Sequence, residues 1–150
     1  MLSANAFDHA WIARHIPHQG AMCLLDHVER WDEQHVRCCA SSHRAPDNPL
    51  RAHGRLGVAC GIEYAAQAMA VHGALTTQDA ARARVGYLVS VRGARLLAAR
   101  LDDIAGDLEI VATSAMRSGG NVLYEFAVSA GGKVLLEGRA AVILNAEGLS

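Results

Sequence analysis

A carboxylate and a carboxamide stand on one face of an otherwise apolar segment. In CGIEYAAQAMAVHGAL (residues 60–75), Glu63 and Gln67 are four residues apart, so they share a face if the segment is helical. A carboxyl group held among apolar side chains can transfer a proton to or from a substrate. Alternatively, Glu63 is only a negative charge that stabilises the N-terminus of a helix.

The cysteines and histidines do not form a metal-binding motif. Cys23, Cys38, Cys39 and Cys60 contain no CxxC pair, and adjacent Cys38 and Cys39 would point to opposite faces of a strand. The eight histidines show no HExxH or HxH spacing. We expect no metal and no cofactor. Cys60 adjoins the expected helix start, where a thiolate would be stabilised, but free cysteines usually behave as small buried hydrophobes.

The elements that would position these groups follow from periodicity and turn residues. A short helix is predicted over residues 7–15, and a long apolar helix over 58–75, after a loop over 43–57 that contains two prolines. A hairpin joins two strands across Asp32, Glu33 and Gln34. The predicted strands cover residues 22–31, 35–42, 85–97, 107–116, 122–130 and 133–144, and glycines separate the last three.

This order of elements predicts a single α+β domain over residues 1–150. The long helix is too apolar for water, and an antiparallel sheet of about six strands wrapped round it would bury it. Such a sheet covers the helix on one side only. A homodimer that buries the remaining small-residue surface and an edge strand is therefore our hypothesis.

Charge and hydropathy exclude several classes of partner. With 14 basic and 15 acidic side chains the formal charge is −1, which gives no net attraction to nucleic acid or to an anionic membrane. No run of about 18 apolar residues is free of polar breaks, and the first 20 residues do not resemble a secretion signal. We expect a cytoplasmic protein without a membrane span.

Three motifs resemble a known enzyme family. IPHQGAMCLLDHV (residues 16–28), the NPL of the long loop and GIEYAAQAM (residues 61–69) are similar to the hotdog-fold 3-hydroxyacyl-acyl-carrier-protein dehydratases. The closest likeness is to the small branch found with aryl-polyene and related fatty-acid-like pathways. The resemblance spans nearly the whole chain and implies a hotdog fold.

The resemblance also implies site residues. Dehydration needs a base for the proton beside the thioester carbonyl and an acid for the departing hydroxyl, and a histidine with a carboxylic acid can fill both roles. Glu63 is the implied carboxyl group. Gln67, also expected among the substrate-binding residues, is either an orienting hydrogen-bond partner or a residue with only a structural role. His18, in the Pro-His motif, is the favoured histidine, and His53 is the alternative, because the commoner dehydratases carry their histidine in a loop that here is shorter and lacks its prolines.

Substrate binding is expected at the start of the long helix. Backbone N–H groups of Val58, Ala59 and Cys60 could polarise the thioester carbonyl, aided by the helix dipole. Arginines at 82, 84, 92, 95 and 100 could meet an acidic acyl carrier protein or its phosphopantetheine phosphate, or form a solvated face.

Three functions are compatible with these residues. The first is dehydration of 3-hydroxyacyl thioesters on an acyl carrier protein to trans-2-enoyl thioesters, in a fatty-acid-like or polyene pathway. The second is an acyl thioesterase in which Glu63 activates water. The third is a catalytically silent subunit that pairs with another dehydratase in a hetero-oligomer. The sequence does not specify the acyl chain length, the carrier or the pathway.

Overall fold

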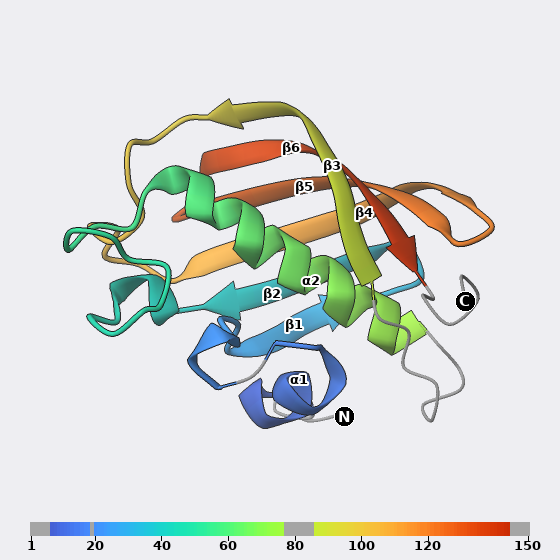
Figure 1. The fold of residues 1–150 in the computed structure, drawn as a ribbon, viewed down its shortest axis with the longest axis horizontal. Helices are drawn as coiled ribbons and strands as arrows, with labels where there is room; N and C mark the ends of the chain where they lie inside the picture. The colour runs from blue at the N-terminus through green and yellow to red at the C-terminus, as the bar shows by residue number, and fades with distance from the viewer. Residues whose placement is uncertain (1–6, 19, 77–85, 145–150) are drawn as a thin grey trace.

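A six-stranded antiparallel sheet curves round one long helix (Figure 1). The computed structural model describes residues 7–18, 20–76 and 86–144. The strands lie in the order β1-β2-β4-β5-β6-β3, and each neighbouring pair is antiparallel. Their bounds are β1 (His27–Trp31), β2 (His35–Ala40), β3 (Gly86–Leu96), β4 (Leu108–Ser118), β5 (Asn121–Ala130) and β6 (Lys133–Leu144). The predicted α+β architecture is confirmed.

The long helix α2 (Gly61–Thr76) packs directly on the sheet because small residues let it come close. A Cβ atom at Gly61 would lie 2.7 Å from the Cδ2 atom of Leu136 on β6, so only glycine fits there without a shift. Side chains around most of the helix circumference are buried, including Tyr64, Ala68 and Val71. A helix that is apolar nearly all round needs such a cover.

The predicted hairpins are present. The turn between β1 and β2 is held by Asp32, whose Oδ1 accepts the backbone N–H groups of Gln34 and His35 at 2.8 and 2.7 Å. Gly131 and Gly132, between β5 and β6, have φ angles of 58° and 80°. Residues with side chains rarely adopt two successive left-handed conformations, so the glycines fix this two-residue turn.

Several predicted boundaries were wrong. The predicted strand over 22–31 begins only at His27, although the Asp26 N–H also donates to the Cys39 carbonyl at 2.8 Å. The Leu24 N–H bonds to the Gln67 side chain instead of a neighbouring strand. The next strand ends at Ala40, where a 3-10 turn (Ser42–Arg44) begins. The long helix opens with a separate 3-10 turn (Val58–Cys60) before its α-helical part.

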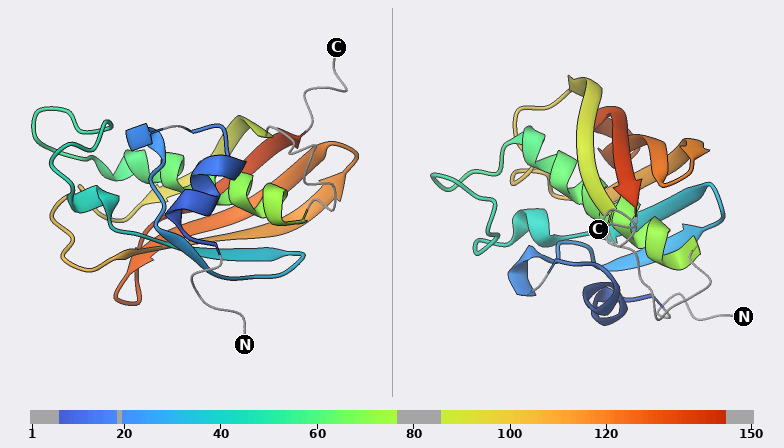
Figure 2. Two further views of the ribbon diagram at one scale, coloured as in Figure 1. Left: turned by 90° about the horizontal axis from the view of Figure 1, so that it is seen from below. Right: turned by 45° about the vertical axis from the view of Figure 1, so that its right-hand side comes forward.

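The N-terminal helix α1 (His9–His15) lies beside α2 and the β1 edge (Figure 2). The Asp8 side chain caps it by accepting the Trp11 N–H at 2.9 Å, and Ile12 anchors it in the core. The segment after α1 contains a 3-10 turn (Gly20–Met22), and hydrogen bonds between the Gln67 side chain and the backbone of Met22 and Leu24 tie it to α2. At the opposite edge of the sheet β3 pairs with β6 and, among the described residues, with no other strand. No helix in the described ranges is long and apolar enough to cross a membrane.

Candidate active site

The structure brings His18 and Glu63 together. His18 follows α1 and Pro17, whereas Glu63 lies in the first turn of α2. The His18 Nε2 atom is 2.9 Å from the Glu63 Oε1 atom, and the two side chains are 24% and 33% exposed. A half-buried histidine and carboxylate at this distance share a proton and can exchange it.

Gln67 holds the segment that follows His18 against helix α2, which carries Glu63. Its Oε1 atom accepts the Leu24 N–H at 2.9 Å, and its Nε2 atom donates to the Met22 carbonyl at 2.6 Å. The same Nε2 lies 3.5 Å from Glu63 Oε1. Gln67 is fully buried, with its amide engaged by these protein groups. Its contacts are those of a positioning residue and leave it without access to a substrate.

The surroundings of the pair change the pKa of Glu63 and leave one nitrogen of His18 without a partner among the described residues. The hydrogen bond from His18 lowers the pKa of Glu63, burial opposes this, and the Gln67 amide adds to the lowering. In the described part of the chain, the His18 Nδ1 atom is buried without a hydrogen-bond partner.

A small apolar pocket opens beside the pair. It has a volume of about 130 Å³ and is lined by His18 and Glu63 together with Ala66, Met69, Ala70, Leu88 and Val142. The polar pair therefore occupies one wall, and α2, β3 and β6 supply apolar walls. Leu88 is 40% exposed although it lines the pocket, because it lies on the edge strand β3. This pocket can take an acyl group next to a proton donor and acceptor.

His53 is not part of this arrangement. It lies exposed at the tip of a turn in which Ala52 and Arg55 exchange two backbone hydrogen bonds, and its φ angle is 54°. It is absent from the residues that line the pocket with His18 and Glu63.

The helix start offers fewer free amides than the sequence suggested. The Val58 N–H donates to the Ala99 carbonyl at 3.3 Å, and the Cys60 N–H to the Gly57 carbonyl at 3.0 Å. Ala59 is exposed, and no described backbone group outside its own turn engages its amide. Burial raises the pKa of the Cys60 thiol, which disfavours a nucleophilic thiolate.

Sequence reasoning missed the residues that shape the pocket and its surroundings. Met69, Leu88 and Val142 are ordinary core residues in sequence, and only packing places them at the pocket. Two residues of the quoted motifs have a structural role: Asn48 of NPL donates to the Tyr64 hydroxyl of GIEY at 3.1 Å, and Ser42 shares a hydrogen bond with the same hydroxyl at 2.7 Å. This network ties the long loop to α2.

The arginine cluster is partly neutralised within the chain. Arg95 pairs with Glu137 at 2.9 Å, and Arg100 pairs with Asp102. Arg92 lies on the outer face of the sheet, in a hollow of about 550 Å³ that also contains Arg139. Arg82 and Arg84 lie outside the described residues.

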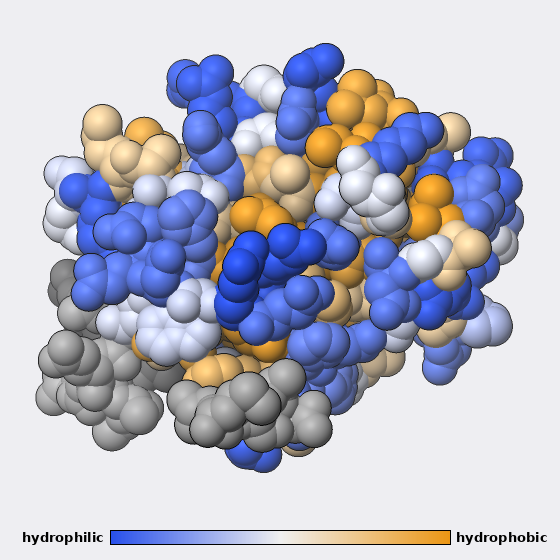
Figure 3. Space-filling model, turned by 180° about the vertical axis from the view of Figure 1, so that it is seen from behind, coloured by the Kyte–Doolittle hydropathy of each residue, from blue (hydrophilic) through white to orange (hydrophobic). Residues whose placement is uncertain are grey.

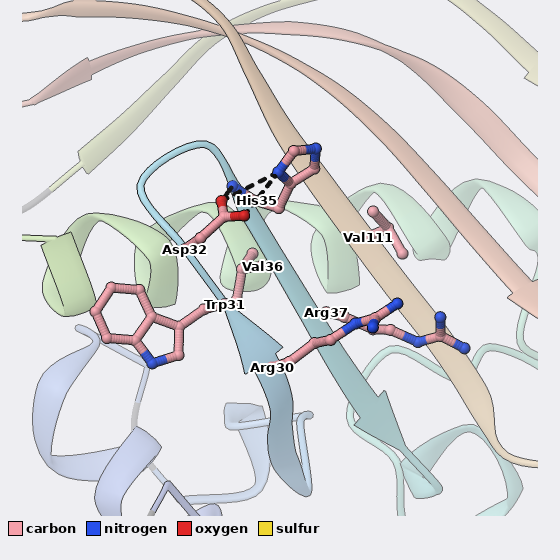
Figure 4. A pocket seen from close by; sticks show the side chains of 7 residues that line it. All are labelled: Arg30, Trp31, Asp32, His35, Val36, Arg37 and Val111. Atoms are coloured by element: carbon pink, nitrogen blue, oxygen red, sulfur yellow. Dashed lines mark hydrogen bonds and ion pairs between the residues drawn. The ribbon is translucent and has the colours of Figure 1, made fainter.

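The outer face of the sheet carries other hollows. On the back of the molecule, hydrophilic and hydrophobic surface alternate (Figure 3). A second hollow, of about 340 Å³, lies against β1, β2 and β4 (Figure 4). Its polar wall includes Asp32 and His35, which are hydrogen-bonded to each other at the hairpin turn. Neither hollow shares a residue with the pocket of His18 and Glu63.

The family is decided by a comparison of the sequence with family models. Residues 10–148 match the model of the ApeP-like family, described as ApeP dehydratase. The chain belongs to the ApeP-like dehydratase family. The resemblance of the Pro-His and GIEY motifs to dehydratases of this type is thereby confirmed. None of the curated proteins matches the sequence significantly.

Solved structures show the same fold. The dehydratase heterocomplex ApeI:P from Xenorhabdus doucetiae aligns with a TM-score of 0.75 and 24% identity, over 92% of this chain and 93% of that one. Thioesterase HI1161 from Haemophilus influenzae aligns with a TM-score of 0.66 and 12% identity, over 96% and 94%. A mutant of thioesterase PA1618 from Pseudomonas aeruginosa aligns with a TM-score of 0.58 and 15% identity, over 79% and 80%. The predicted hotdog fold is confirmed.

Proposed function

We propose that this ApeP-like protein dehydrates 3-hydroxyacyl thioesters carried on an acyl carrier protein to trans-2-enoyl thioesters, in an aryl-polyene or related fatty-acid-like pathway. The observation that supports this most directly is the 2.9 Å contact between His18 Nε2 and Glu63 Oε1 at the wall of an apolar pocket. A histidine and a carboxyl group in contact can supply the base and the acid that the elimination of water requires.

The pair can complete a catalytic cycle without an external proton. In the neutral form of the pair, His18 Nε2 takes the proton from the carbon beside the carbonyl. The Glu63 carboxylic acid protonates the departing hydroxyl, and water leaves as the C–O bond breaks. The products of this step are an imidazolium and a carboxylate. Proton transfer from His18 back to Glu63 restores the starting form.

Substrate binding favours the reactive form of the pair. In the free protein the hydrogen bond from His18 lowers the pKa of Glu63, so the carboxylate predominates. An acyl chain in the pocket excludes water, and this desolvation raises the pKa of the Glu63 carboxyl group. The shift moves the shared proton toward Glu63. Ala59, an exposed residue of the 3-10 turn before α2, carries the remaining candidate amide for a hydrogen bond to the thioester carbonyl.

A second subunit at the β3 edge fits this proposal. Leu88 forms a wall of the pocket and is 40% exposed, and within the described part of the chain β3 has a partner strand on one side only. A partner strand paired there would cover Leu88 and narrow the pocket. We propose a dimer through this edge, either of two copies or with a second dehydratase subunit. The related ApeI:P structure is a dehydratase heterocomplex.

The test measures products of a 3-hydroxyacyl thioester on a carrier protein by mass spectrometry, with the wild type and three variants. Glu63→Gln keeps the size of the side chain but removes the ionisable proton, and His18→Ala removes the base. Each should slow dehydration by roughly 10²-fold or more in a folded protein. His53→Ala is the matched control, with an expected change of less than about twofold because exposed loop side chains contribute little.

The outcomes separate the three functions. Loss of 18 Da from the carrier-bound acyl group identifies a dehydratase, whereas free carrier thiol identifies a thioesterase. A wild type that is inactive alone but accelerates a second dehydratase from the same pathway identifies a silent subunit. Near-full dehydration by Glu63→Gln would refute the mechanism and reduce Glu63 to a charge at a helix end.

A further inference from the structure

Three different metal-ligand side chains gather on the outer face of the β1-β2 hairpin. The ligand atoms of His27, Glu29 and Cys39 all lie within 4.8 Å of one another. His27 and Cys39 are directly opposed across the antiparallel pair. The register between β1 and β2 shifts between Val28 and Arg30, so Glu29 occupies an irregularity of the strand. Such bulges redirect a side chain, and here Glu29 reaches Cys39.

We propose that His27, Glu29 and Cys39 bind a divalent transition-metal ion, Zn²⁺ being the best match. Imidazole nitrogen, thiolate sulfur and carboxylate oxygen are the donors that zinc prefers. Bond lengths of about 2.0–2.3 Å in a tetrahedron place ligand atoms about 3.5 Å apart. Side-chain rotations that move the ligand atoms by about 1 Å would bring the three to this spacing. The fourth position is left to water.

The donor atoms are available for this role. The Cys39 thiol donates to Glu29 Oε1, so a proton now lies between the sulfur and the oxygen that would both face the ion. Binding replaces that proton: an S–metal bond forms, the S–H bond breaks, and the proton leaves to solvent. Within the described residues, the His27 ring has no hydrogen-bond partner that a metal would have to displace.

The surrounding charges suit a divalent cation. Arg37 contacts Oε2 of Glu29 at 3.5 Å and also pairs with Glu109, so it can hold the far oxygen of Glu29 while Oε1 faces the ion. With a divalent ion, the Cys39 thiolate, both glutamates and Arg37, the formal charges sum to zero. Partners that orient a ligand in this way raise metal affinity.

The cluster is separate from the pocket of His18 and Glu63. None of its three residues lines that pocket. Cys38, the neighbour of Cys39, points to the other face of the sheet and is fully buried in the core. Cys38 is therefore a matched control: a cysteine on the same strand that cannot reach the cluster.

The test is a titration of the full chain, stripped with a chelator, with Co²⁺ as a spectroscopic substitute for Zn²⁺. We expect one ion per chain, a thiolate-to-cobalt charge-transfer band in the near ultraviolet, tetrahedral bands in the visible, and loss of all bands when Zn²⁺ displaces the cobalt. Cys39→Ser should remove the charge-transfer band and weaken binding by at least about 100-fold. Cys38→Ala should keep both.

Two ligands that are more exposed than Cys39 keep the test decisive if a cysteine variant fails to fold. Glu29→Gln and His27→Gln should each weaken Co²⁺ binding by at least about tenfold, with the thiolate band present at saturation. The proposal is overturned if the wild type shows no charge-transfer band. It is also overturned if the band persists in Cys39→Ser, or if neither Glu29→Gln nor His27→Gln changes the affinity.

Discussion

Gln67→Met isolates the contribution of one buried amide to stability and to the geometry of the site. Methionine has nearly the length of glutamine and is a good helix former, so the helix itself is preserved. The change removes the acceptor of the Leu24 N–H and the donor to the Met22 carbonyl, at 2.9 and 2.6 Å. Gln67 is fully buried, so water cannot replace these contacts without local opening.

The loss in the free energy of unfolding of Gln67→Met comes mainly from the two backbone groups that are left without partners. A buried donor or acceptor that loses its partner costs about 1–3 kcal/mol, and two such groups give about 3 kcal/mol after partial relaxation. For a chain of this size 1 kcal/mol lowers the melting temperature by about 2–4 °C, so Gln67→Met should melt about 6–12 °C below the wild type. The segment that carries His18 should also shift relative to Glu63. A displacement of about 1 Å can cost 10²-fold in rate, and we expect at least a tenfold loss of kcat.

Calorimetry and the dehydration assay measure the two effects, each at a temperature where the variant is folded. Gln34→Met, at the exposed turn between β1 and β2, is the matched control and should change the melting temperature by less than about 2 °C, as exposed substitutions usually do. Gln67→Met could instead have the same melting temperature as the control and keep full activity. The amide would then not hold the segment that follows His18, and the positioning role of Gln67 would be refuted.

Three further outcomes follow from the structure. Gly61→Ala places a methyl group 2.7 Å from a Leu136 methyl, and the forced shift of α2 should lower the free energy of unfolding by about 1–3 kcal/mol in urea titrations. Replacing Arg92 and Arg95 with Glu should weaken use of carrier-bound substrate far more than use of a small thioester, with a difference that shrinks as salt rises; equal losses on both substrates would exclude carrier docking. Burial lowers the pKa of His72, which bonds to the Tyr124 hydroxyl at 2.8 Å. Below about pH 6.5 His72 binds a proton in the unfolded chain but stays neutral in the folded protein. The free energy of unfolding should therefore fall with decreasing pH, by up to about 1.4 kcal/mol per pH unit for this one group. His72→Gln should flatten the stability profile between pH 7 and 5.5, and an unchanged slope would show that other groups cause it.

The sequence alone determined the elements that have strong local signals. The antiparallel hairpins follow from glycine pairs and from Asp32, and the long helix from its unbroken run of small and apolar residues, because turn conformations and helix burial depend on nearby residues. Glu63 was also recognisable, as a carboxylate at the head of that helix. The segment over 22–26 looked equally local but was predicted wrongly. Its Leu24 N–H bonds to Gln67, which is 43 positions away, and no local pattern records such a contact.

The histidine that meets Glu63 is set by contacts between segments far apart in the sequence. His18 and His53 both precede the helix in sequence, and each stands in a loop where local chemistry allows many directions. The Gln67 amide binds the segment after His18 to α2, whereas the His53 turn closes on itself through Ala52 and Arg55. The cluster of His27, Glu29 and Cys39 likewise depends on strand register and on one irregularity in β1. The spacing of residues along the chain predicts which side chains are neighbours on one helix or strand. Contacts between different helices and strands are set by packing and by the pairing of distant backbone groups.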